Sequence, residues 1–202
     1  MRIAAFVGGI AVGWLTASPV SAQGPAVTMR VLVENNAKVP ASIVADAERH
    51  ASVVYRSAGV AVVWLNDARA ALADGGTLDF TVMLASAQDT PALVRQARAR
   101  NETLGFAAVS STDRGHVAYA LYGRIEDWAG RRHLFVSSLL GEVMAHELGH
   151  LLLGDHNHSE SGIMRANWDL RSGVPDHFTK AQGEAIRQYL LATWHSEGRD
   201  QR

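Results

Sequence analysis

Apolar and polar residues alternate in several short segments of the chain, and this alternation predicts strands. Residues 27–34 read VTMRVLVE, an alternating pattern in a composition rich in β-branched residues. Further strands are predicted at residues 60–65, 78–85, 106–110 and 116–125. Turns are predicted between them at residues 74–76 and 111–115, where glycine and polar residues gather.

Helices are predicted where apolar residues recur every three or four positions. The segment 40–59 shows this spacing between an opening proline and a closing glycine, and residues 91–101 predict a shorter helix. Another helix is predicted to begin at Ser137 or Ser138, either of which is a good N-cap residue, and to end at Gly154.

A last helix is predicted over residues 178–194, where Thr179 and Gln182 have the spacing of a capping box. The predicted order is a strand, a helix, several strands, a histidine-bearing helix, an irregular loop and the last helix. This order predicts an α+β fold with a mixed, twisted sheet that is complete before the histidine-bearing helix begins. No repeat or low-complexity linker interrupts the chain, so residues 23–202 are predicted to form one domain.

The composition is that of a globular protein with one hydrophobic core. The chain has 202 residues, of which 48% are hydrophobic and 19% are charged. The formal net charge is −1 and the basic residues are scattered, so no surface for nucleic acid or anionic lipid is predicted. Because the chain has no cysteine, the fold has to hold without disulfides.

The N-terminal segment has the pattern of a secretory signal peptide. One arginine precedes an apolar run at residues 3–15, and small residues end the segment at Ala22. The run is shorter than the ~20 residues that a membrane span needs, which makes an uncleaved anchor the weaker alternative. Residues 1–22 are therefore predicted to be removed. The mature chain is expected to be secreted or periplasmic, with no stable membrane insertion.

The segment HELGHLLLGDHNH, residues 146–158, holds four of the nine histidines. On a helix, His146 and His150 lie one turn apart on the same face, so both imidazoles can bind one zinc ion. Glu147 follows the first histidine in the HExxH arrangement, in which a carboxylate takes a proton from a zinc-bound water. The spacing therefore predicts two metal ligands and a general base.

HELGH resembles the first half of the metzincin metallopeptidase signature, HExxHxxGxxH, and SGIM at residues 161–164 resembles the methionine turn that follows it. HELGHLLLG, the HS pair at residues 158–159 and GIM also resemble a group of bacterial secreted, largely uncharacterised metzincin-like proteins. These resemblances imply a zincin-like fold and a zinc-dependent peptidase with a peptide or protein substrate. They also imply that Met164 forms an apolar floor beneath the metal.

The sequence offers three candidates for the third ligand. The metzincin signature has its glycine at position 153, which is Leu153, and here the glycine follows as Gly154. His156 keeps the distance of the signature, whereas His158 is the match in the bacterial group and is favoured for that reason. A second class of zinc peptidase, the gluzincins, takes its third ligand from a glutamate on a later helix, which would make Glu184 the ligand.

Two functions compete on this pattern. The favoured one is an exported zinc-dependent peptidase, and the alternative is a non-catalytic exported metal-binding protein in which His156 and His158 both join the pair. Glu142 lies one turn before His146 and is expected to be a solvated helix residue rather than a partner of a ligand. Tyr119 and Tyr122 are expected to be ordinary strand aromatics. The histidines outside the motif are expected to be surface or locally bonded residues: His50, His116, His133, His177 and His195.

Overall fold

The structure is a computed structural model that describes residues 27–69, 77–100, 102–109, 115–154, 158–166 and 176–196. The predicted signal peptide, most of both predicted turns, His156 and the side chain of His195 lie outside the described residues. Among the described helices, none combines the length and the apolar character needed to cross a membrane.

The described strands form one sheet in the order β2-β1-β3-β5-β4. From one edge to the other these are Val60–Leu65, Val27–Glu34, Phe80–Ala85, Val117–Leu121 and Gly105–Ala107. The first four run parallel, and β4 runs antiparallel to β5 at the edge. The sheet is mixed and complete before the histidine-bearing helix, as predicted. Because it is mostly parallel with helices between its strands, however, the architecture is mixed α/β rather than α+β.

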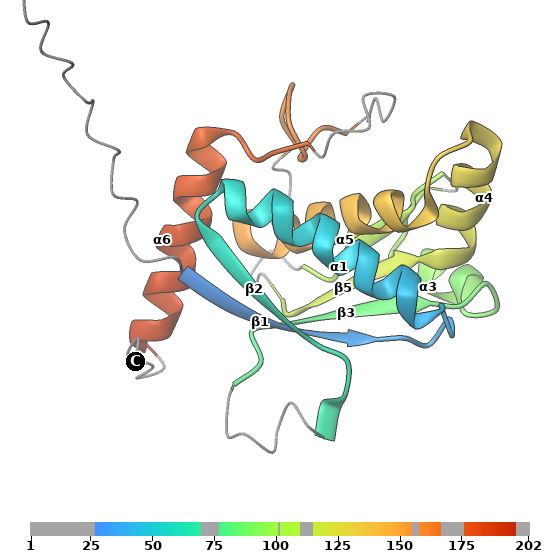
Figure 1. Ribbon diagram of the computed structural model, residues 1–202, viewed down its shortest axis with the longest axis horizontal. Coiled ribbons are helices and arrows are strands. Elements are labelled where there is room, and N and C mark those ends of the chain that lie inside the picture. Colours follow the sequence, from blue (N-terminus) through green and yellow to red (C-terminus); the bar gives the residue numbers. More distant parts are fainter. Residues whose placement is uncertain are drawn as a thin grey trace, which may run out of the picture.

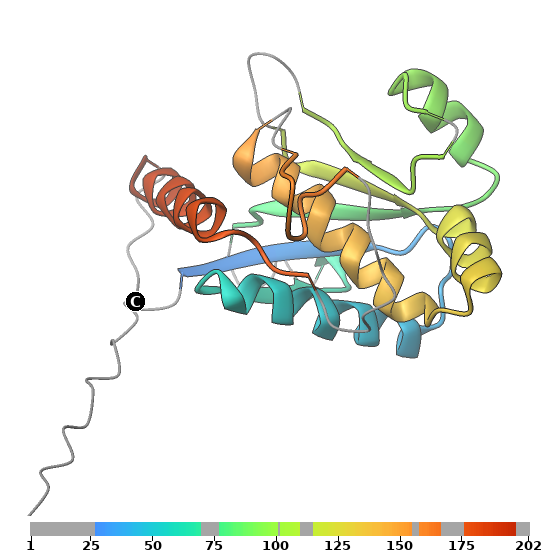
Figure 2. The same ribbon diagram turned by 90° about the horizontal axis from the view of Figure 1, so that it is seen from above.

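Two long helices pack side by side on one face of the sheet, α1 (Ala41–Ser57) and α5 (Val136–Leu153) (Figure 1). The helices α3 (Thr90–Gln96) and α4 (Tyr122–Arg132) lie at one end of the sheet, and α6 (Lys180–Ser196) lies at the other end (Figure 2). The arrangement leaves α5 in the middle of the molecule, between the sheet, α1 and α6.

Helix α5 is buried on almost every side, because residues 139–149 are all buried. Leu140, Leu148 and Leu151 are fully buried in the main hydrophobic core. A helix in this position holds its polar side chains in a fixed, water-poor environment. That environment is where the histidine motif lies.

The predicted strand at residues 116–125 is wrong beyond its first half. The strand ends at Leu121, and α4 begins at Tyr122. Tyr122, Ile125 and Ala129 are buried and recur every three or four positions, which is helical spacing. The helix follows the strand with no linker, so the apolar residues of its buried face continue directly from those of the strand and resemble one alternating pattern.

Three caps are predicted for α5 and α6, and the structure confirms two of them. Gly154 ends α5 with a φ of 90°, a conformation that favours glycine, and Thr179 and Gln182 form the predicted capping box before α6. The predicted N-cap of α5 is wrong, since the helix begins at Val136 with Phe135 as its N-cap and no side-chain cap. The left-handed residue His133 ends α4 and turns the chain directly into α5.

Candidate metal centre

His146 and His150 lie one turn apart on α5, and their Nε2 atoms are 3.1 Å apart. The rings meet edge to face with centroids separated by 4.7 Å. Two nitrogen ligands of a tetrahedral zinc ion lie roughly 3.3 Å apart when each Zn–N bond is ~2.0–2.1 Å. The separation of the two Nε2 atoms therefore fits a pair of ligands on one ion.

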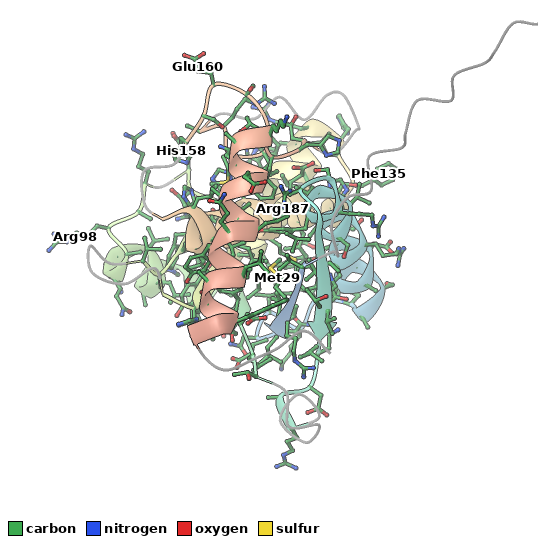
Figure 3. The ribbon with its side chains drawn as sticks, turned by 90° about the vertical axis from the view of Figure 1, so that its left-hand side faces the viewer. Met29, Arg98, Phe135, His158, Glu160 and Arg187 are labelled. Atoms are coloured by element: carbon green, nitrogen blue, oxygen red, sulfur yellow. The ribbon has the colours of Figure 1, made fainter. Side chains whose placement is uncertain are left out.

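His158 completes a cluster of three histidines from the chain beyond α5. Its ring centroid lies 5.4 Å from that of His146 and 4.9 Å from that of His150. One ligand atom from each of the three lies within 4.8 Å of the others. Figure 3 shows His158 on the chain that passes the upper part of α6, where Glu160 points away from the molecule. The donor set, three imidazoles at one point, suits zinc.

Glu184, the alternative ligand, is not part of this cluster. It lies on α6, where it pairs with Arg187 and accepts a hydrogen bond from Gln188. Its side chain is half exposed. Among the described residues, the three histidines form the only group of potential metal ligands that come together.

The orientation of His146 is fixed by a hydrogen bond from its Nδ1 to the carbonyl oxygen of Ile163, 2.8 Å away. Because a carbonyl only accepts, Nδ1 carries the proton and Nε2 keeps its lone pair. Burial, followed by the charge of neighbouring His150, lowers the pKa of His146 to about 3. The ring is therefore neutral at physiological pH and presents its ligand atom toward the cluster.

Met164 packs against α5 at Gly149, which lies between His146 and His150 in the sequence; its implied role as a floor beneath a metal stays a prediction. Met164 is fully buried, and a β-carbon added to Gly149 would lie only 2.5 Å from its Sδ atom. The backbone turns at Gly162, with a φ of 79°, and Ser159 N–H donates to the carbonyl of Met164. The missing side chain at Gly149 is what lets the methionine approach α5.

Glu147 lies on the same helix beside the cluster, and burial raises its pKa to about 8. Its side chain is covered by the edge strand β4, because a β-carbon on Gly105 would lie 2.8 Å from Glu147 Cγ. A carboxylate held out of water gains proton affinity, which suits a group that accepts a proton during a reaction. No signal in the sequence marks Gly105, since a glycine in a short strand has many ordinary explanations.

The expectation that Glu142 is solvated is wrong. Its carboxylate is only 3% exposed, and it accepts a hydrogen bond from His50 Nε2 at 2.8 Å. His50 is therefore neither a surface residue nor bonded only to its own neighbourhood. The sequence also offered no indication of the role of Tyr55, which is fully buried and donates a hydrogen bond to the carbonyl of Ala145, next to His146. Both partners lie on α1, about 90 positions earlier, so no local pattern reveals them.

The two tyrosines in the former strand prediction have structural roles. Tyr119 stacks on Phe106 of the edge strand with ring centroids 4.7 Å apart. Tyr122 opens α4, and its hydroxyl group is close to Glu126. Neither belongs to the histidine cluster. His116 is exposed, in agreement with its expected surface position, and it bonds the carbonyl of Asp79 and stacks on Phe80.

The fold and the cluster together define a mixed α/β domain whose central helix carries two members of a three-histidine site suited to a metal ion. No protein-family model matches the chain, and no curated protein matches it. Among solved structures, an archaemetzincin from Methanopyrus kandleri is similar at 18% identity and a TM-score of 0.48, over 85% of this chain and 99% of that one. A Thermotoga maritima protein solved in solution is similar at 14% identity and a TM-score of 0.38, over 84% and 92%.

Proposed function

We propose that the protein is an exported zinc-dependent peptidase. Zinc is bound by His146, His150 and His158, and Glu147 is the general base. One observation carries the proposal. Three imidazoles, two from α5 and one from the chain beyond it, gather around one point, and the buried carboxylate of Glu147 follows His146 on α5. Metal storage alone has no use for a carboxylate in that position.

A zinc ion in this site would activate a water molecule for attack and polarise the scissile carbonyl. Glu147 accepts the proton of the attacking water and passes it to the leaving amine. His146 is held by Ile163 in the tautomer that leaves Nε2 available, so no rearrangement is needed before the metal binds. The outcome is hydrolysis of an amide bond.

A peptide substrate is favoured by the position of β4. This strand lies at the edge of the described sheet, and Gly105 at its start packs against Glu147. An extended peptide can pair with the exposed backbone of an edge strand. A peptide bound in this way would run past the general base, which supports a peptide or protein as the substrate.

Export is part of the proposal because of the signal-like residues 1–22. N-terminal sequencing of the protein produced with its full chain is expected to find Gln23 as the first residue of the exported form. Recovery of an intact Met1 outside the cytoplasm would contradict cleavage after Ala22.

The decisive experiment compares the mature chain with Glu147→Ala on a complex peptide mixture, with cleavage read by mass spectrometry and zinc measured in both proteins. New termini are expected from the wild type alone, while both proteins hold one zinc ion. Zinc in both samples without cleavage in either would instead favour the non-catalytic metal-binding protein. Equal cleavage by both would exclude Glu147 as the base.

A further inference from the structure

Glu142 is a buried carboxylate that gathers donors from two other parts of the chain. His50 on α1 donates from Nε2 to Oε1 at 2.8 Å, and the backbone N–H of Asp176 donates to the same oxygen at 3.3 Å. The other oxygen, Oε2, is buried and has no hydrogen-bond partner. A buried carboxylate with one unpartnered oxygen costs stability, so its burial at this position calls for a compensating role.

The stretch that Glu142 binds is hydrogen-bonded to the stretch whose carbonyl orients His146. Asp176 accepts a hydrogen bond from Arg165 at 2.5 Å, and Arg165 directly follows Met164. The next residue after Asp176, His177, accepts the N–H of Ile163 through its carbonyl at 2.9 Å. Two stretches of chain, residues 158–166 and 176–179, are thereby joined to each other.

The carbonyl of Ile163 is the group that holds Nδ1 of His146. Glu142 and His146 are one turn apart on α5, and both side chains hydrogen-bond the joined segments, in addition to the packing of Met164 and Phe178 at Gly149. The contact of Glu142 with Asp176 ties the joined segments to α5 one turn before His146, whose Nδ1 is held by the Ile163 carbonyl. His50 ties the same carboxylate to α1, which lies along α5 in Figure 2.

We infer that Glu142 is a positioning residue for the metal centre: through Asp176 and the Ile163–His177 pair it holds the carbonyl that orients His146. The inference rests on the metal ligands of the proposed function but not on catalysis. It explains why a side chain with a hydrogen-bond acceptor is kept at this buried position. Outer groups that orient a metal ligand typically change metal affinity about 10- to 100-fold when removed.

The test uses Glu142→Ala, Glu142→Gln and Glu48→Ala as a matched control. Glu48 is also a buried carboxylate, on α1, and burial raises its pKa while Asn66 hydrogen-bonds it, away from the segments after α5. Both donors to Glu142 converge on Oε1, so a glutamine retains that acceptor and offers an amide at the unpartnered position. Only the alanine at position 142 removes the connection.

Two readouts are needed. The first is zinc affinity by competition with a chelator, where Glu142→Ala is expected to bind about 10- to 100-fold more weakly. Glu142→Gln and Glu48→Ala are expected to bind as the wild type does. The second is the tautomer of His146 in the metal-free protein, from long-range proton–nitrogen NMR. The proton is expected on Nδ1 in the wild type and divided between the two nitrogens in Glu142→Ala.

The inference is overturned if Glu142→Ala is less stable but keeps its zinc affinity and its Nδ1 proton, since a merely structural role gives that result. It is also overturned if Glu142→Gln loses as much affinity as the alanine variant, because charge rather than hydrogen bonding would then be responsible. If Glu142→Ala does not fold, Asp176→Pro, which removes the backbone donor and keeps the Glu142 carboxylate, is measured in the same way and is expected to bind zinc more weakly than the wild type. A wild type that binds zinc without cleaving peptides would end the proposed function and leave this inference standing.

Discussion

The backbone of Gly105 lies against the side chain of Glu147, so that a β-carbon on residue 105 would fall 2.8 Å from Glu147 Cγ. The same β-carbon would lie 2.7 Å from the carbonyl of Tyr119 and 2.8 Å from Val143. The backbone of β4, helix α5 and the Glu147 carboxylate thus meet at one point. The edge strand therefore has a defined position relative to the proposed general base, and any side chain on residue 105 would change it.

Gly105→Ala is expected to reduce kcat/KM by about 100-fold, because displacement of a reacting group by ~1 Å can cost that much. Zinc content is expected to be unchanged, since the histidines are not touched. The control is Gly130→Ala on α4, where an added β-carbon meets nothing within 4 Å. Peptide cleavage and zinc content are measured on both variants. Wild-type cleavage by Gly105→Ala would show that the strand can move without consequence.

Gly149→Ala is expected to lower the free energy of unfolding, although alanine is the better helix former. The added carbon would lie 2.5 Å from Met164 Sδ and 3.1 Å from the ring of Phe178. Overpacking of this kind costs about 1–3 kcal/mol, against a gain of up to about 1 kcal/mol in helix propensity. Urea denaturation measures the difference. Gly130→Ala has the gain without the clash, so it is expected to be at least as stable as the wild type.

Local sequence patterns predicted most of the helices and strands, and they predicted the pair His146 and His150 within the site. The strands at residues 27–34 and 60–65 were predicted with the bounds that the structure has, because alternation along a strand is a property of neighbouring residues. The i, i+4 spacing of His146 and His150 likewise implied their juxtaposition, which the helix produces. The capping box of α6 was predictable for the same reason.

The rest of the site depends on residues that are distant in the sequence. Glu142 was expected in solvent because its partner, His50, lies 92 positions earlier on another helix. The ring of His158 comes close to the pair through the path of the chain after Gly154, which spacing alone does not fix. The contact between Gly105 and Glu147 likewise arises only when the sheet and α5 pack together. Tertiary packing decides each of these, and no local pattern encodes it.

The stability of the metal-free protein is expected to fall as the pH rises, because of Glu147. Burial raises its pKa from 4.5 to about 8, so the folded state favours the protonated carboxyl. The protonated carboxyl of Glu147 therefore adds to the free energy of unfolding in full below pH 4.5, and this contribution is lost as the pH rises through 8. Glu147→Gln cannot ionise. Between pH 5 and pH 8 its free energy of unfolding is expected to rise by roughly 1–3 kcal/mol relative to the wild type, because each pKa unit corresponds to about 1.4 kcal/mol and the protein partly relaxes around the charged carboxylate.

Urea denaturation of both metal-free proteins at the two pH values measures this effect. His146 acts in the opposite direction, since its pKa is lowered from 6.5 to about 3 and its contribution is lost as the pH falls through 3. That contribution is common to both proteins and cancels in the comparison. A difference between Glu147→Gln and wild type that does not change with pH would show that the carboxyl is accessible to water.

His158→Ala is expected to lose zinc affinity by more than about 100-fold, because a direct ligand matters more than the outer groups whose removal costs up to that factor. His146 and His150 would then hold the metal alone. Glu184→Ala is the control, since Glu184 pairs with Arg187 on α6, and its zinc affinity is expected to equal that of the wild type. Chelator competition on His156→Ala completes the set. If that variant loses zinc while His158→Ala retains it, the third ligand is His156, and the approach of His158 to the pair is packing alone.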